Sequence, residues 1–456
     1  MNMVAAWGAS SFPTASHAIR LSTMKMSRVT HGRADAPASQ AGRPVLIRAM
    51  GPSDTALCEP NTTNPANDAM AAAGMRIALF SGNYNCVRDG ANRALNRLVD
   101  HLLARGAAVR VYSPTIADPA FAPAGDLVSV PSVPIPGRSE FRVALGLPGS
   151  VRADVERFAP NIVHVSAPDL LGTGAQKLAR GLGVPVVASL HTRFETYFDY
   201  YGLGALRHWG ERRLRRFYRA SDCVLAPNAD SAESLAAMGV PDEDIAIWGR
   251  GVDPAAFSPA LRDLGWRRGL GYRDDEIVPI FFGRLVVEKG IATFADTIQA
   301  LRERGYPLRP LIVGAGPAEA RFRALLPDAV FAGHLDGRAL GRAVASADIL
   351  INPSMTEAFG NVNLEAMASG LAVVSADAGS ARALIVSGRS GLLTPPVASA
   401  LADAVAQLVE RPDLRFAMAA AAHAEARGYR WSEILDKVVA SYADLLGRRR
   451  RASAAA

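Results

Sequence analysis

Short apolar runs alternate with helical runs twice along this chain, and this alternation constrains the fold more than any other feature. The run MRIALF begins at Met75, and the polar loop SGNYNCVRDG, the helical run ANRALNRLVDHLLARG and a second apolar run, AAVRVYSP, follow it. Gly106 ends the helical run, so the unit reads strand–helix–strand. Further apolar runs follow at 161–168, 184–191 and 222–227. Near-continuous apolar strands between helices predict an α/β fold with a parallel sheet covered on both faces.

The alternation restarts after a connector rich in Gly and Pro, GRGVDPAAFSP (249–259). Five more strands are predicted, at 278–285, 309–316, 329–335, 348–354 and 371–378. A second α/β domain and a cleft between the two domains follow from this pattern. Ligands bind beyond the carboxyl ends of strands in such sheets, so the site is expected in the loops that follow them.

Four segments are predicted. Residues 1–74 are rich in Ala, Ser, Pro, Thr and Asn without a helical or strand period, which predicts a disordered leader or an over-extended start before a natural Met75. The two α/β domains take 75–255 and 256–428. Residues 429–456 carry a packing helix with one apolar stripe, followed by a frayed basic tail that includes the arginines at 448–451.

Composition excludes several classes of protein. The 456 residues carry a net charge of +7, which permits attraction to phosphates or anionic lipids but is small for a nucleic-acid binder, so no nucleic-acid partner is expected. The three cysteines lie far apart, which predicts neither a disulfide framework nor a zinc site and favours the cytoplasm. No apolar run reaches the roughly 18 residues that span a bilayer.

The stretch MTEAFGNVNLEAMASG (355–370) follows a predicted strand and begins a helix. A helix N-terminus attracts phosphate, and Gly360 lets a ligand approach closely. Asn361 and Glu365 share a helix face, so the Glu365 carboxylate lies about one turn, roughly 5 Å, from the anion site and can accept two ribose hydroxyls. Glu357 in the loop can reach the other end of the same ligand. A solvated helix start explains the spacing equally well.

A second group of polar residues lies in FFGRLVVEKG, where Arg284 and Lys289 follow a buried strand. Two cations at this strand end form a plausible diphosphate clamp, although surface Arg and Lys are common. His191 ends another predicted strand, and taken alone it is explained by a buried, hydrogen-bonded histidine.

GRLVVEKG and TEAFGNVNLEAMASG together resemble the donor half of a retaining GT-B glycosyltransferase of family 4. The motifs ASLHTRFETY, GRGVD, VGAGP and FAGHL occur in the order that the family has. The resemblance extends from Met75 to the final helix. It implies two Rossmann-like domains around a deep cleft, with the C-terminal helix packing back on the N-terminal domain.

The resemblance also implies roles for individual residues. Arg284 and Lys289 would bind the donor diphosphate and stabilise the charge that develops on it. Glu365 would hold the ribose and Glu357 the sugar hydroxyls. Further donor contacts are implied for backbone or small residues: Gly82, Gly314, Ala332, Gly333, His334, Phe359, Gly360 and Asn361.

His191 would face the donor sugar across the cleft and orient it. The glycine pair of the first loop is present only loosely, as Gly82 and Gly90. The family is understood to react on the front face of the donor, with the leaving diphosphate helping to deprotonate the acceptor. No metal or other cofactor is expected, because the acidic run DED (242–244) lies in a polar turn and the cations carry the phosphate charge.

A basic helix is predicted in LGALRHWGERRLRRFYRAS (203–221), with an apolar face of Leu203, Leu206, Gly210, Leu214 and Phe217. Four arginines cluster on the opposite face: Arg212, Arg215, Arg216 and Arg219. An ordinary solvated helix face is one interpretation. Attraction to anionic lipid headgroups at the inner face of the plasma membrane is the other.

The resulting hypothesis is a hexosyltransferase that moves a sugar from a nucleotide donor to a hydroxyl of a lipid or glycan. GDP-mannose is the first choice of donor, because HTRFETYFDYYGLG looks most like lipid-directed mannosyltransferases. A glycolipid synthase that uses UDP-glucose or UDP-glucuronate is the alternative. A non-catalytic sugar- or lipid-binding module and a dinucleotide-dependent oxidoreductase are the other classes, and the oxidoreductase is disfavoured because the full GxGxxG fingerprint is absent.

Overall fold

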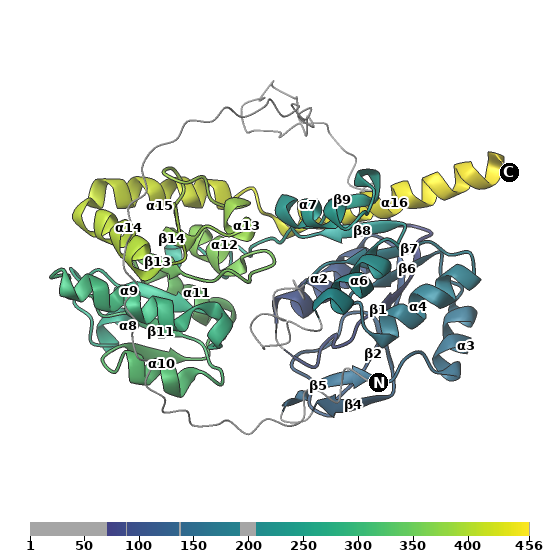
Figure 1. The fold of residues 1–456 in the computed structure, drawn as a ribbon, viewed down its shortest axis with the longest axis horizontal. Coiled ribbons are helices and arrows are strands. Elements are labelled where there is room, and N and C mark those ends of the chain that lie inside the picture. The colour runs from purple at the N-terminus through teal and green to yellow at the C-terminus, as the bar shows by residue number, and fades with distance from the viewer. Residues whose placement is uncertain (1–70, 88, 136–137, 192–206, 456) are drawn as a thin grey trace, which may run out of the picture. The chain divides into compact units, whose positions relative to one another are not determined.

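The computed structural model describes residues 71–455 apart from 88, 136–137 and 192–206. It confirms the predicted α/β class, with two parallel sheets that follow one another along the chain (Figure 1). Most of the predicted leader lies outside the described residues. Ordered packing begins before Met75, because Ala72 is fully buried and its N–H donates to the Arg105 carbonyl oxygen at 3.0 Å. The domain boundary predicted at residue 75 is therefore a few residues late.

The N-terminal sheet has seven strands in the order β3-β2-β1-β6-β7-β8-β9, all parallel. They are β1 Arg76–Phe80, β2 Ala108–Ser113, β3 Asp126–Ser129, β6 Ile162–Val165, β7 Val186–Ser189, β8 Cys223–Ala226 and β9 Ile245–Ile247. A separate antiparallel pair joins β4 Ser132–Ile135 to β5 Arg138–Ala144. The strand order reverses between β1 and β6, which places a binding crevice at their carboxyl ends.

Helices cover both faces of this sheet, because successive strand residues alternate between two apolar cores. Ile77 and Leu79 face a core shared with α2 (Gly90–Ala104) and α16 (Trp431–Ala455). Ala78 and Phe80 face the other core. That second core includes α3 Gly149–Phe158, α4 Leu170–Gly181, α6 Arg207–Tyr218 and α7 Ala229–Ala237. The C-terminal helix thus packs on the N-terminal sheet, as the resemblance implied.

The C-terminal sheet has six parallel strands in the order β12-β11-β10-β13-β14-β15. They are β10 Pro279–Phe282, β11 Leu311–Val313, β12 Val330–Gly333, β13 Ile349–Asn352, β14 Ala372–Ala376 and β15 Leu392–Thr394. One face carries α11 Gly337–Ala345, α12 Asn361–Ala368, α13 Gly379–Arg382 and α15 Pro412–Ala426. The other carries α9 Ile291–Glu303, α10 Glu319–Leu325 and α14 Ala398–Glu410. Its switch point lies between β10 and β13.

The remaining elements are short. The helix α8 Leu264–Gly269 precedes this sheet, and the 3₁₀ turns are η3 Asp242–Asp244, η4 Pro259–Leu261 and η5 Val287–Lys289. The turn η3 is the acidic run DED of the sequence. Asp244 from this run pairs with Arg448 at 2.9 Å.

The basic end of the chain is helical, and the prediction of a frayed tail from residue 448 is wrong. Helix α16 continues to Ala455. Arg448 is held by Asp244, and Arg449 pairs with Asp222 at 2.7 Å. These two ion pairs with N-terminal loops extend the helix beyond its apolar stripe, which ends near Leu445.

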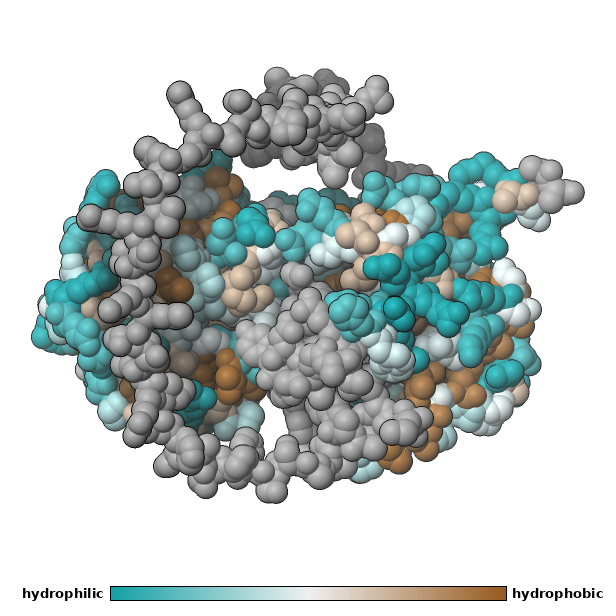
Figure 2. All heavy atoms as spheres, in the orientation of Figure 1, coloured by the Kyte–Doolittle hydropathy of each residue, from teal (hydrophilic) through white to brown (hydrophobic). Residues whose placement is uncertain are grey.

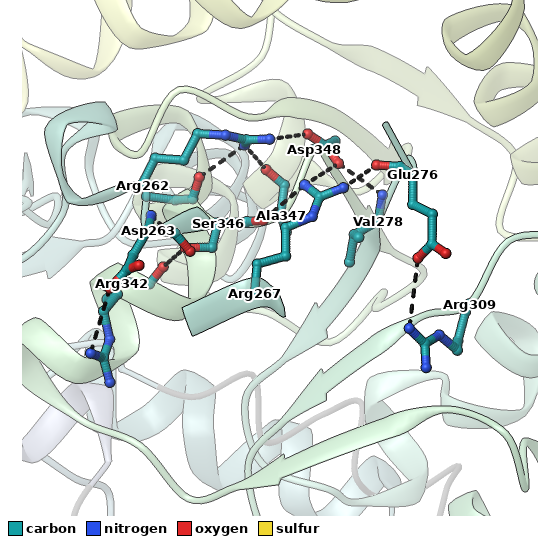
Figure 3. Close-up of polar contacts among 11 residues, drawn as sticks. Arg262, Asp263, Arg267, Glu276, Val278, Arg309, Arg342, Ser346, Ala347 and Asp348 are labelled. Atoms are coloured by element: carbon teal, nitrogen blue, oxygen red, sulfur yellow. Dashed lines mark hydrogen bonds and ion pairs between the residues drawn. The ribbon is translucent and has the colours of Figure 1, made fainter. Parts of the chain in front are cut away.

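A buried ion pair fixes the entry to the C-terminal sheet (Figure 3). The Arg267 side chain is 1% exposed and donates to the Asp348 carboxylate at 2.9 Å. Asp348 also accepts from Arg262 at 2.7 Å and from the Val278 backbone N–H at 2.8 Å. One carboxylate therefore joins α8, the start of β10 and the start of β13.

Helix α6 has the amphipathic form that its sequence predicts, over the part of that sequence within the described residues. Gly210, Leu214 and Phe217 are buried, whereas Arg212, Arg215, Arg216 and Arg219 are exposed. The surface over α6 is hydrophilic in Figure 2. Leu203 and Leu206 lie outside the described residues. Among the helices that the structure describes, none combines the length and apolar character needed to cross a membrane.

Candidate functional site

A cavity of about 440 Å³ lies at the carboxyl ends of the C-terminal strands and is lined by that half and by α2 of the N-terminal half. Eight residues singled out in the sequence line it: Gly90, Arg284, Lys289, Gly314, His334, Glu357, Asn361 and Glu365. They come from loops after β10, β11, β12 and β13 and from the first turns of α2 and α12. The two motifs that were predicted separately thus meet in one cavity.

Lys289 and Glu357 form a direct ion pair in this cavity. The Lys289 Nζ lies 2.5 Å from the Glu357 Oε1, and the two side chains are 25% and 15% exposed. The neighbouring Thr356 hydroxyl donates to the Glu288 carbonyl oxygen at 3.2 Å. The loop after β13 is therefore fixed against the turn after β10, and a cation and a carboxylate reach the ligand space side by side.

The N-terminus of α12 opens into the cavity. Gly360 at its N-cap has φ of 91°, a conformation that favours glycine, and it has no side chain to accept from the first backbone N–H groups. Beneath this turn, Asn352 donates to Asn363 at 2.9 Å, and Asn363 donates to Ser375 at 3.2 Å, all buried. This network anchors the start of the helix, and the N–H groups of such a start can receive an anion.

Glu365 lies one turn into α12 and faces arginines of the N-terminal half. The pKa of Glu365 is raised to about 8, mainly by burial and also by the Glu357 charge, although Arg93 and Arg97 lower it. Both arginines line the cavity from α2, and the Arg97 guanidinium lies 4.9 Å from the Trp431 ring centroid. A carboxyl group in this setting is readily switched to the charged form by a hydrogen-bond-donating ligand.

These arginines were not predicted from the sequence, and neither were Asp89, Asp253 and Trp431, which also line the cavity. One signal was available for the arginines, because Arg93 and Arg97 are four apart and share a helix face. Asp89 caps α2 by accepting from the Asn92 N–H at 2.7 Å. Burial raises the pKa of the Asp89 carboxyl above its usual value, although the Asn92 hydrogen bond and the Arg284 charge oppose this shift. Nothing in the sequence indicated which helix face looks across to the second sheet.

Packing within the protein explains why glycine is needed at the predicted positions, in addition to any room it leaves for a nucleotide. A Cβ on Gly314 would lie 1.9 Å from the Gly283 carbonyl oxygen, so this glycine lets two strand-end loops pack together. A Cβ on Gly82 would lie 2.6 Å from the Asp169 carboxylate, and Gly82 is not among the lining residues. Gly90 lines the cavity instead. A Cβ on Gly90 would lie 2.6 Å from the Asn361 amide nitrogen, so the glycine leaves room for that side chain.

Five other predicted residues are not among those that line the cavity: His191, Ala332, Gly333, Phe359 and Gly360. Phe359 is 7% exposed and belongs to the apolar core of the C-terminal sheet. Ala332 and Gly333 end β12 just before His334. The side chain of Phe359 therefore anchors the loop and leaves only its backbone for a ligand.

The His191 ring is engaged by protein groups at both nitrogens. The Arg250 guanidinium donates to Nδ1 at 2.8 Å, so Nδ1 carries no proton and Nε2–H donates to the Ser189 hydroxyl at 2.8 Å. Burial and the Arg250 charge hold the His191 pKa well below its usual value. Protein groups therefore engage both ring nitrogens of His191, which is not among the residues that line the cavity.

The chain of hydrogen bonds continues from His191 into the core. Ser189 donates to His164 at 2.9 Å, and His164 lies 2.6 Å from the Tyr442 hydroxyl in α16. Burial lowers the His164 pKa to about 3, so this ring is neutral. The stretch after His191, which carried the likeness to mannosyltransferases, lies outside the described residues.

The described residues contain no cluster of three His, Cys, Asp or Glu side chains that could hold a metal ion. Asp242 and Glu243 of the DED run are exposed, as their turn predicted. The cavity is lined by four cationic side chains and six carboxylates: Arg93, Arg97, Arg284 and Lys289, and Asp89, Asp253, Glu288, Asp336, Glu357 and Glu365.

Comparison with known families decides the class of this site. Residues 88–256 match Glycosyltransferase Family 4, and residues 276–411 match Glycosyl transferases group 1. A GDP-mannose-dependent alpha-mannosyltransferase of Mycolicibacterium smegmatis is 34% identical over 385 residues, which is 82% of this chain and 99% of that protein. The chain belongs to the family 4 glycosyltransferases. A Mycobacterium tuberculosis protein of the same description is 33% identical over 82% of this glycosyltransferase and 98% of its own length.

Solved structures support the fold of this glycosyltransferase. Sucrose-phosphate synthase from Thermosynechococcus elongatus superposes with a TM-score of 0.68 at 20% identity and covers 82% of this chain and 100% of its own. Anabaena HepE, solved with UDP and glucose, has a TM-score of 0.62 at 20% identity and covers 81% and 99%. The GT-B architecture is thereby confirmed, and the enzyme is a glycosyltransferase that uses a nucleotide sugar.

Proposed function

We propose that this enzyme is a retaining hexosyltransferase that transfers mannose from GDP-mannose to a hydroxyl of a lipid or glycan. The observation that carries the proposal is the single cavity in which Arg284, the Lys289–Glu357 pair and Glu365 surround an uncapped helix start. GDP-mannose is chosen because the two relatives above, each matched over nearly its whole length, are described as GDP-mannose-dependent.

The diphosphate would lie between Arg284, Lys289 and the first N–H groups of α12. Cations and helix N-termini preorganised around the leaving group stabilise its developing charge, and removing one such donor typically costs about 100- to 1000-fold in rate. Glu365 would accept from the ribose hydroxyls, and Glu357 would accept from the sugar hydroxyls. The acceptor would attack the front face of the donor, with a diphosphate oxygen taking its proton.

A donor panel tests this proposal. GDP-mannose, UDP-glucose and UDP-glucuronate are each titrated by thermal shift and then offered with lipid acceptors, with and without EDTA. We expect GDP-mannose to stabilise the protein most and to release GDP, unchanged by EDTA because the cavity's own cations carry the phosphate charge. Preference for a UDP sugar would support the alternative donor, and donor binding without transfer would support the non-catalytic module.

The affinity for GDP should rise with pH through the Glu365 transition. The free carboxyl has a pKa of about 8, so it is largely neutral at pH 6.5, whereas ribose hydroxyls donate best to the carboxylate. Titration calorimetry in buffers of different ionisation enthalpy should therefore show proton release on GDP binding near pH 7. Glu365→Gln should abolish this release. A wild-type protein that releases no proton would contradict the role given to Glu365.

For the acceptor side, we propose that α6 lies on an anionic membrane surface. Its exposed arginines accompany Trp209, which is 51% exposed and amphipathic, as interfacial helices require. Each basic residue near such a surface contributes about 1 kcal/mol. The acceptor would then be a membrane lipid presented next to the N-terminal sheet.

Replacing Arg212, Arg215 and Arg216 by Ala should weaken binding to vesicles that contain phosphatidylserine by at least tenfold in a sedimentation assay. The matched control replaces three exposed arginines of the C-terminal half, Arg321, Arg338 and Arg427, which changes the net charge equally. Equal loss in both variants would show that net charge alone attracts the protein, and unchanged binding would remove the membrane proposal.

A further inference from the structure

One buried amide side chain connects the N-terminal sheet to the loop that carries Glu357. Asn228 follows β8 and is 5% exposed. Its Oδ1 accepts from the Ser231 N–H at 2.9 Å and so caps α7. Its Nδ2 donates to the Ala358 carbonyl oxygen at 2.7 Å. The two ends of the amide thus hold a helix of one half and a loop of the other.

Two further contacts join the same surfaces. Asp230 in α7 pairs with Arg382 of α13 at 3.3 Å, and a Cβ on Gly379 would lie 2.1 Å from the Asp230 carboxyl carbon. Beside them, a Cβ on Gly249 would contact the Phe359 ring at 3.4 Å. Helix α7 therefore lies close to the C-terminal half. At this contact, the Asn228 side chain hydrogen-bonds to the loop that carries Glu357.

The bonded carbonyl belongs to the residue directly after Glu357. On its other side, the loop is held by the Lys289–Glu357 ion pair and by the Thr356 bond to Glu288. Those two contacts come from the C-terminal half alone. Asn228 supplies the contact from the N-terminal half, so the position of the Glu357 carboxylate depends on both halves.

We propose that Asn228 is a positioning residue for transfer, because it holds the Glu357 loop in place only while the two halves are together. The inference rests on the proposed function, since it takes Glu357 to grip the donor sugar. A carboxylate displaced by about 1 Å can cost on the order of 100-fold in rate, whereas the nucleotide, held by Glu365 and Arg284, should bind as before.

Asn228→Ser and Asn228→Asp separate this role from capping. Both replacements keep a good N-cap acceptor for Ser231 and lose the donor to Ala358. We expect kcat for transfer to fall roughly 10- to 100-fold, with the Kd for GDP within about twofold of wild type and the protein still folded. Arg382→Gln loosens the same interface without touching the loop and should retain near-wild-type kcat.

Hydrogen exchange gives a readout that needs no substrate. In the unliganded protein, amides of residues 356–361 should exchange faster in Asn228→Ser than in wild type or Arg382→Gln. Unchanged kcat in both Asn228 variants, or equal losses in Arg382→Gln, would overturn the proposal. If the wild type transfers from no nucleotide sugar, the proposed function fails, and the exchange rates alone decide whether Asn228 holds the loop.

Discussion

Lys289→Ala and Glu357→Ala should each reduce kcat/KM for transfer by about 100- to 1000-fold while the protein stays folded. In the proposed function Lys289 stabilises charge on the leaving diphosphate and Glu357 binds the sugar hydroxyls, and the two side chains form an ion pair at 2.5 Å. Both side chains are partly shielded from water, so their electrostatic effect is stronger than at the surface. Steady-state release of GDP from GDP-mannose measures the loss.

Controls distinguish this effect from damage to the fold. Lys437 is exposed on α16, away from the cavity, and Lys437→Ala should keep full activity. Each single variant leaves one partly buried charge without its partner, whereas the double variant removes both charges. The double variant should therefore melt higher than at least one single variant and remain inactive. Near-normal turnover in either single variant would overturn the site assignment.

Asp348→Ala should cost about 3–5 kcal/mol in the free energy of unfolding, because it leaves the Arg267 guanidinium buried without a counter-charge. The substitution also removes the acceptor for Arg262 and for the Val278 N–H, so the starts of β10 and β13 loosen together (Figure 3). Urea unfolding followed by tryptophan fluorescence measures the change. Trp266 in α8 is a nearby reporter.

A surface ion pair provides the comparison. Asp403 pairs with Arg304 at 2.6 Å, but its side chain is 70% exposed, and such pairs contribute little. Asp403→Ala should unfold close to wild type. Similar midpoints for the Asp348 and Asp403 variants would contradict the importance given to the buried network.

Most strands that the sequence predicted are inner strands buried on both faces, because these have near-continuous apolar runs, and the half-buried edge strand β12 was predicted from its apolar run VFAG. The edge strands β3, β9 and β15 were missed, since each has exposed or half-buried positions and only three or four residues. The hairpin β4–β5 was missed because neither SVPI nor RSEFRVA is a near-continuous apolar run. Residues that follow the inner strands of the C-terminal sheet could be predicted as site residues, because parallel strands end at a common edge.

Contacts between the two sheets could not be predicted from local pattern. Arg93 and Arg97 reach the cavity because of the way α2 faces the C-terminal half. Arg250 donates a hydrogen bond to His191, which lies 59 residues away in the sequence. The basic end of α16 is ordered by Asp222 and Asp244, which are distant in sequence. In each case the deciding partner lies on another element, and the spacing within one segment carries no information about it.

The anomeric configuration of the transferred sugar tests the central claim most directly. The wild-type enzyme is incubated with GDP-mannose and a membrane-lipid acceptor mixture, and the product is isolated and analysed by NMR through its one-bond C1–H1 coupling. We expect an α-mannoside formed with release of GDP, and no product from Lys289→Ala. A β-linked product would contradict retention, and the absence of GDP release, with no transfer from any other nucleotide sugar, would contradict the function assigned to the cavity.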